Sequence, residues 1–144
     1  MIWETRGHTF DFTQRGAVMG ILNVTPDSFS DGGRFALRDA AMAHCERLLK
    51  DGADVLDIGG ESTRPGAQTV VPEEEIQRTV PIIAGLRAAG VQTAISIDTR
   101  KAAVAQEALA AGAGLINDVP TVQELMDRIM SEADSLIKER LAGL

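Results

Sequence analysis

Four short apolar segments alternate along the chain with longer segments of helical periodicity. The apolar segments are residues 18–23, 54–59, 93–98 and 114–119. Each is almost continuous in apolar residues, which is typical of parallel strands covered on both faces. The segments between them are residues 37–52, 73–90 and 101–112. Their apolar residues recur at helical spacing, so they predict three helices.

The ends of these elements carry recognisable signals. Each predicted helix closes on a glycine suited to a left-handed cap, namely Gly52, Gly90 and Gly112. Pro81 is expected to interrupt and bend the second helix. Residues 2–12, before the first strand, predict a small hairpin that turns at Arg6 and Gly7.

Strands that alternate with helices predict parallel βα units, and both a barrel and a doubly wound sheet fit this pattern. The polar residues favour the barrel. Each predicted strand is followed by polar side chains: Asn23, then Asp57 with Glu61, then Asp98, then Asn117 with Asp118. In a (β/α)8 barrel the carboxyl ends of the strands converge on the active site.

The length sets the size of this barrel. A complete barrel takes ~250 residues, and the chain has 144. We therefore expect an α/β fold made of about half a TIM-type (β/α)8 barrel, as a single domain over residues 1–144. Residues 121–144 carry an amphipathic stripe that predicts a C-terminal helix.

Composition narrows the class of partner. The chain is 44% hydrophobic and 24% charged, as in ordinary globular proteins. Its net charge of −7, without a basic patch, argues against nucleic acid. No apolar run is long enough for a membrane span, and no signal peptide is recognisable. Cys45 is the single cysteine, which favours a reducing cytoplasm.

The loop that follows the first strand is unusually polar. Asn23 ends the strand, and Asp27, Phe29 and Asp31 follow within residues 24–33. No His/Cys cluster has the spacing of zinc ligands. If a metal binds here, Asn23 and this loop favour oxygen-ligated Mg²⁺, held jointly with a phosphate.

A second unusual loop covers residues 57–67. Two glycines allow the backbone to approach a ligand closely, and Ser62 and Thr63 supply hydroxyl groups. Arg64 supplies a planar guanidinium suited to phosphate or carboxylate. A simple connection with helix-capping hydroxyls would explain Ser62 or Thr63, but not Arg64 as well. The loop therefore predicts an anion-binding function.

Two further strand ends carry candidate ligands. Asp98 is either the N-cap of a helix beginning near Lys101 or a carboxylate that binds a ring N–H beside an amino group. Asn117 can do the same with one donor and one acceptor, whereas Asp118 would brace the turn. Glutamates 73–75 are expected to be structural, because they suit the positive end of a helix dipole.

Three segments together resemble dihydropteroate synthase. They are GILNVTPDSFSDGG at residues 20–33, GADVLDIGGESTRPGA at 52–67 and ISIDTRKAAVAQEALAAGAGLINDV at 95–119. Methyltransferases that bind a folate pterin share versions of the second and third segments. The first segment favours the synthase.

The resemblance implies a folate-biosynthesis enzyme that is a target of sulfonamides. Such an enzyme joins 4-aminobenzoate to 6-hydroxymethyl-7,8-dihydropterin diphosphate, forming 7,8-dihydropteroate and pyrophosphate. In that chemistry the diphosphate departs first, with Mg²⁺ neutralising it, and the arylamine attacks the resulting pterin-stabilised cation.

By the same resemblance, Asn23 would meet Mg²⁺ and diphosphate. Thr63 and Arg64 would contact the diphosphate and shape the aminobenzoate pocket. Asp98 and Asn117 would bind the pterin edge.

The resemblance also assigns the first loop. Asp27 and Asp31 would act in catalysis with Arg64, on a mobile loop where Phe29 covers the aromatic amine.

Three segments typical of the family are not found: Asp-Pro-Gly-Phe-Gly-Phe, Ser-Arg-Lys and Arg-Val-His-Asp. Residues 120–144 are expected to correspond to a later helix, joined after truncation or internal deletion beyond the fourth strand. The alternatives are a non-catalytic pterin- or phosphate-binding module, a half-barrel that self-assembles as a homo-oligomer, and a pterin-binding methyltransferase domain.

Overall fold

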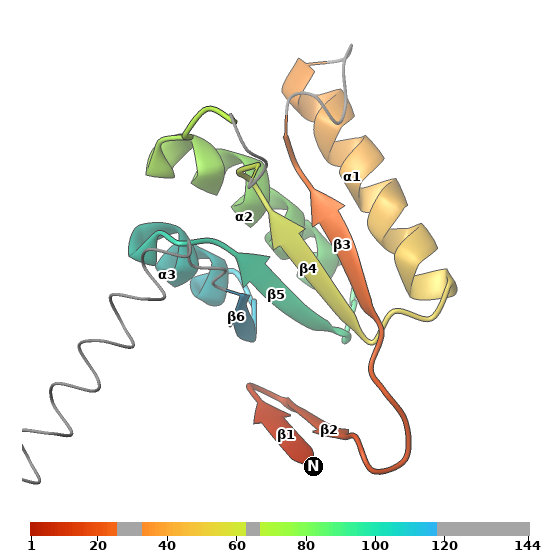
Figure 1. The fold of residues 1–144 in the computed structure, drawn as a ribbon. Helices are drawn as coiled ribbons and strands as arrows, with labels where there is room; N and C mark the ends of the chain where they lie inside the picture. Colours follow the sequence, from red (N-terminus) through yellow and green to blue (C-terminus); the bar gives the residue numbers. More distant parts are fainter. Residues whose placement is uncertain (26–32, 63–66, 118–144) are drawn as a thin grey trace, which may run out of the picture.

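The computed structural model describes residues 1–25, 33–62 and 67–117 (Figure 1). The chain begins with a hairpin of two antiparallel strands, β1 (Ile2–Thr5) and β2 (His8–Asp11). The turn falls at Arg6 and Gly7, and Gly7 has a φ of 83°. The predicted hairpin is confirmed.

A parallel sheet of four strands follows the hairpin. Its strands are β3 (Met19–Asn23), β4 (Val55–Gly59), β5 (Ala94–Asp98) and β6 (Leu115–Asn117). The helices between them are α1 (Gly33–Lys50), α2 (Pro72–Ala88) and α3 (Ala102–Ala110). All seven elements occur where the hydrophobic pattern predicts them, with boundaries that differ by a few residues.

The strand order distinguishes the two folds that fit the sequence. A doubly wound sheet reverses its strand order at a switch point, whereas here the order β3-β4-β5-β6 follows the chain without reversal. Parallel crossovers are right-handed, so successive crossovers in one direction place α1, α2 and α3 on the same face of the sheet (Figure 1). This is the arrangement of a barrel segment.

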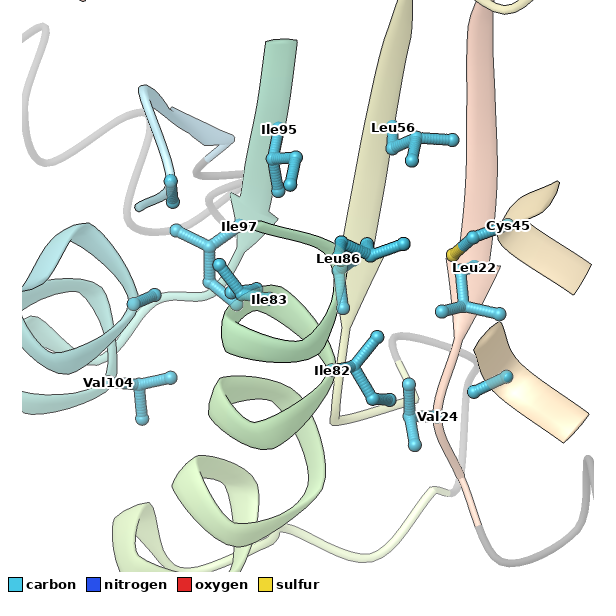
Figure 2. Close-up of a cluster of buried hydrophobic side chains, with 14 residues drawn as sticks. Leu22, Val24, Cys45, Leu56, Ile82, Ile83, Leu86, Ile95, Ile97 and Val104 are labelled. Atoms are coloured by element: carbon cyan, nitrogen blue, oxygen red, sulfur yellow. The ribbon is translucent and has the colours of Figure 1, made fainter. Parts of the chain in front are cut away.

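The core lies between the sheet and the helices. Alternate strand residues, including Leu22, Leu56 and Ile97, are buried on the face that meets the helices. Figure 2 shows these side chains gathered with Ile83 and Leu86 of α2.

The face of the sheet opposite the helices is exposed along β3. On this face the side chains of Met19 and Ile21 in β3 are 41% and 59% exposed. The residues of β4 and all but the last residue of β5 are buried on both faces, whereas Asn23, Asp98 and Asn117 at the strand ends are exposed or half-buried.

The helix ends largely follow the predicted signals. Gly52, Gly90 and Gly112 all have positive φ, which confirms the three glycine caps. However, α2 runs unbroken through Pro81, so the expected interruption is wrong. A proline inside a helix costs about 3 kcal/mol, but burying each large apolar side chain gains about 1.5–3 kcal/mol. Ile82, Ile83 and Leu86, which follow Pro81 on α2, are all buried.

Contacts at the amino-terminal ends of the strands fasten the hairpin and the loops. His8 Nε2 lies 2.6 Å from the carbonyl oxygen of Gln92, just before β5. The Arg87 guanidinium at the end of α2 donates hydrogen bonds to the carbonyl oxygens of Val91, Thr93 and Gly112. This end of the sheet is therefore occupied by structural contacts, which leaves the carboxyl ends for a ligand.

None of the helices formed by the described residues is long and apolar enough to cross a membrane.

Cys45 provides a test of the packed core. Its side chain is fully buried, and burial raises the pKa of the thiol to about 11. We expect a thiol reagent at pH 8 to leave Cys45 unmodified in native buffer and to modify it completely in denaturant, as followed by intact-mass measurement. Modification at the same rate in both conditions would contradict a packed core around α1.

Candidate ligand-binding site

The last residues of the four strands form one row across the sheet. Asn23 pairs with Gly59, Gly59 with Asp98, and Asp98 with Asn117. Residues paired in this way on parallel strands direct their side chains to the same face. The structure therefore brings together three residues that the sequence predicts as ligands: Asn23, Asp98 and Asn117.

Gly59 creates the space between two of these side chains. A Cβ atom placed on Gly59 would lie 3.4 Å from Asp98 Oδ2 and 3.6 Å from Asn23 Oδ1. Gly59 itself places no side chain between the Asn23 amide and the Asp98 carboxylate, which any larger residue at this position would do.

The structure contradicts the helix-cap alternative for Asp98. The N-cap of α3 is Lys101, which makes no side-chain cap bond. The backbone N–H of Lys101 donates instead to Thr99 Oγ1, at 3.2 Å. Asp98 ends β5 beside Gly59, on the face of the sheet opposite the helices.

Asp57 is an additional polar residue on this face. It lies two residues before Gly59 on β4, so both face the same side of the sheet. Its side chain is buried, and Asn117 Nδ2 donates a hydrogen bond to Asp57 Oδ2 at 3.1 Å. The sequence marks Asp57 as a polar strand end but does not pair it with Asn117, which is sixty residues away.

An ion-pair cluster lies in the segments that follow the carboxyl ends of β4 and β5. Glu61 follows β4 and accepts hydrogen bonds from Lys101 and from Arg100, the latter at 2.9 Å. Lys101 Nζ also donates to Glu75 Oε2 at 2.6 Å, and the Glu75 side chain is fully buried. We call these four residues the Glu61 cluster. It joins the loop after β4, the loop after β5 and the first turn of α2.

Glu75 therefore differs from its two neighbours. All three glutamates lie in the first turn of α2, as the helix-dipole interpretation requires. The buried ion pair with Lys101 is a further role of Glu75 that the sequence did not indicate. A lysine 26 positions further along the chain gives no local signal of this contact.

Both ends of the Glu61–Lys101 pair have shifted pKa values. Burial disfavours the charged Glu61 carboxylate, but hydrogen bonds from Lys101 and Arg100 outweigh it and lower the pKa of Glu61. Burial likewise disfavours the charged Lys101 ammonium, but hydrogen bonds to Glu61 and Glu75 raise the pKa of Lys101. Both groups are charged at neutral pH, so the ion pair holds the start of the loop after β4 in place.

Several predicted site residues lie outside the described residues. They are Asp27, Phe29 and Asp31 of the first loop, Thr63 and Arg64 of the second loop, Asp118, and the expected helix in residues 120–144. Described segments lead to both loops from the carboxyl ends of β3 and β4.

The side chains at the strand ends limit which metal ion could bind there. Among the described residues no group of three or more His, Cys, Asp or Glu side chains is placed to hold a metal. Asn23 offers a single side-chain oxygen. This fits Mg²⁺, which commonly keeps water ligands and binds through one or two protein oxygens together with phosphate oxygens.

Parallel βα units with polar side chains at the carboxyl ends of the strands define a barrel of the kind that binds small molecules at that end. The profile of the pterin binding enzyme family matches residues 19–137, and the chain belongs to this family. It is 50% identical over 117 residues to the dihydropteroate synthase of Bacillus subtilis (strain 168), a match that covers 81% of the chain and 40% of the relative.

Other relatives carry the same name. The dihydropteroate synthase of Clostridium beijerinckii is 53% identical over 110 residues, covering 76% of the chain and 40% of the relative. The structure of the Xanthomonas albilineans dihydropteroate synthase with 4-aminobenzoic acid superposes with a TM-score of 0.72 at 55% identity, over 78% of this chain and 41% of that one. A Yersinia pestis dihydropteroate synthase in complex with a sulfonamide drug also gives 0.72, at 53% identity, over 83% of this chain and 42% of that one.

These comparisons agree with the predicted family and with a partial (β/α)8 barrel. The chain spans about 40% of the length of the curated relatives that it matches.

Proposed function

We propose that this chain carries the first part of a dihydropteroate synthase site and binds 6-hydroxymethyl-7,8-dihydropterin diphosphate. The observation that supports this best is the row of Asn23, Gly59, Asp98 and Asn117 at the carboxyl ends of adjacent strands. About 50% identity to dihydropteroate synthases supports the choice of substrate.

The chemistry of the row suits a pterin. The Asp98 carboxylate accepts hydrogen bonds from adjacent N–H groups, as a ring N–H and an exocyclic amino group provide. Asn117 supplies both an acceptor and a donor. Asn23, at the other end of the row, would meet the diphosphate together with Mg²⁺, which neutralises negative charge when bound.

The proposed reaction transfers the pterinylmethyl group to 4-aminobenzoate. The C–O bond to the diphosphate breaks, and the leaving group takes the electron pair. The amine nitrogen then forms a C–N bond to the methylene carbon and loses a proton. Thr63 and Arg64 are proposed to contact the diphosphate, so that catalysis rests on positioning and charge stabilisation.

The first loop completes the proposed site. Asp27 and Asp31 are proposed to act in catalysis with Arg64, while Phe29 covers the aromatic amine. A pterin-binding methyltransferase domain is the weaker alternative, because the relatives at about 50% identity are named as synthases.

Two further aspects are proposed on narrower grounds. Exposed apolar side chains on both edge strands, Ile21 on β3 and Ile116 on β6, favour association of copies into a homo-oligomer. The single cysteine favours a cytoplasmic location.

Thermal unfolding tests the proposed binding. With the pterin diphosphate and Mg²⁺ at ~100 times the dissociation constant, the native state gains about 2.7 kcal/mol. We expect the melting temperature to rise by roughly 5–11 °C. Asp98→Ala should abolish the rise, because the carboxylate that accepts the pterin N–H groups is removed.

Asp51→Ala is the matched control. Asp51 is an exposed aspartate in the turn after α1, at the opposite ends of the strands, so this variant should keep the full rise. The proposal fails if the wild-type chain shows no rise, or if Asp98→Ala retains it.

A further inference from the structure

Asp57 is a buried carboxylate that neither the core nor the proposed ligand contacts explain. One of its oxygens accepts a hydrogen bond from Asn117 Nδ2. The other oxygen, Oδ1, is buried and has no hydrogen-bond partner among the described residues. Buried polar atoms are nearly always paired in native proteins, and an unpaired buried acceptor costs about 1–3 kcal/mol. An acceptor in this state can be satisfied by a bound ligand or by an ordered water.

The position of Asp57 sets it apart from a packing residue. It lies in register with Ile21 on β3 and Ser96 on β5, one row below Gly59 and Asp98. Its partner Asn117 lies on β6, so the hydrogen bond passes across β5. An apolar side chain at position 57 would fill the same volume without an unpaired oxygen, so packing alone gives no reason for an aspartate here.

The hydrogen bond also orients Asn117. A carboxylate accepts hydrogen bonds and cannot donate them. The amide nitrogen of Asn117 therefore faces Asp57, and the amide oxygen is directed away from it. With Asp98 one strand away in the same row as Asn117, the site offers acceptors at three neighbouring positions: Asp98, Asn117 Oδ1 and Asp57 Oδ1.

We propose that Asp57 is a specificity-determining residue of the pterin site. It holds the Asn117 amide with its oxygen toward the ligand and supplies Oδ1 as a further acceptor. The site then selects heterocycles whose edge carries adjacent N–H donors, as a 2-amino-4-oxopteridine does. This inference rests on the proposed function, because it assumes that the pterin binds along this row.

Calorimetric titration of the full chain with the pterin diphosphate and Mg²⁺ tests the inference. Asp57→Asn replaces one of the two carboxylate oxygens with an NH2 donor of the same size, so position 57 can no longer both accept from Asn117 Nδ2 and accept from the ligand. Losing one hydrogen bond to a charged group weakens binding by roughly 10- to 100-fold. The melting temperature without ligand should stay within about 2 °C of wild type, which separates a binding role from a structural one.

Exchanging the residues at positions 57 and 117 tests whether the lost binding affinity can be restored. In Asp57→Asn combined with Asn117→Asp, the new amide at 57 donates to the new carboxylate at 117, and a second carboxylate oxygen faces the ligand. We expect this double variant to recover most of the lost affinity. Asn117→Asp alone should bind weakly, because two carboxylates then face each other.

A pterin analogue without the 2-amino group tests selectivity. Wild type should prefer the natural pterin, and Asp57→Asn should lose most of that preference. An unchanged dissociation constant in Asp57→Asn would overturn the inference and leave the proposed function intact. Equal weakening for both ligands, with a lower melting temperature, would make Asp57 structural. No binding by wild type would overturn the proposed function and this inference with it.

Discussion

Replacing Lys101 by Met is expected to lower the free energy of unfolding by about 3–5 kcal/mol. Lys101 is the cation that contacts the fully buried carboxylate of Glu75, and it also contacts Glu61. Glu75 Oε1 already has no hydrogen-bond partner among the described residues. Without Lys101, therefore, a buried charge is left uncompensated. Small domains are stable by about 5–15 kcal/mol, so this loss is a large share of the total.

Two controls isolate the cause. Arg100→Met removes the other cation of the Glu61 cluster, but its side chain is 36% exposed, and exposed pairs contribute about 0–1 kcal/mol. Adding Glu75→Gln to Lys101→Met removes the buried charge and should recover most of the stability. Urea unfolding followed by circular dichroism measures all four chains. Equal losses in Lys101→Met and Arg100→Met would show that the burial of Glu75 is not the cause.

Replacing Gly59 by Val is expected to weaken binding of the pterin diphosphate by roughly 30- to 2,000-fold. The new Cβ would lie in ordinary contact with Asp98 and Asn23, and the two methyl groups would fill the space between them. A hydrogen bond to a charged group contributes about 1.5–3 kcal/mol and one to a neutral group about 0.5–1.5 kcal/mol. Losing both amounts to about 2–4.5 kcal/mol, which gives the stated range of dissociation constants.

The neighbouring glycine serves as the matched control. A Cβ on Gly60 would lie 2.9 Å from side-chain atoms of Glu75 and Thr79, on the helix side of the sheet. Such overpacking typically costs 1–3 kcal/mol, so Gly60→Ala should lower stability while the folded chain keeps its affinity. Gly59→Val should instead lose affinity for the pterin diphosphate while the folded chain keeps its stability. Titration calorimetry and urea unfolding of both variants measure this contrast. If Gly59→Val binds as wild type does, the ligand does not occupy the row.

Most of the fold could be predicted from the chain because its signals are local. The alternation of short apolar strands with helical segments, and the glycine caps such as Gly52, depend on residues that are close in sequence. Pro81 is the exception. Local rules place a break there, but the packing of Ile82, Ile83 and Leu86 on the sheet holds the helix together.

The candidate site was predicted as a set of strand ends. Asn23, Asp98 and Asn117 could be named because each follows an apolar run, and parallel strands bring their carboxyl ends to one edge. The choice between a helix cap and a ligand for Asp98 could not be made from the sequence. Both roles place an aspartate before a helix, and only the structure shows that Lys101, not Asp98, is the N-cap of α3.

The sequence by itself determined the order of strands and helices, the family to which the chain belongs and the residues at the strand ends. Only the tertiary structure decided which face each glycine occupies, that Asp57 reaches Asn117, and that Lys101 compensates Glu75. Secondary structure follows from periodicity along the chain, so the sequence carries it. Contacts between residues 26 or 60 positions apart depend on strand register and side-chain direction, which arise only when the sheet and helices pack together.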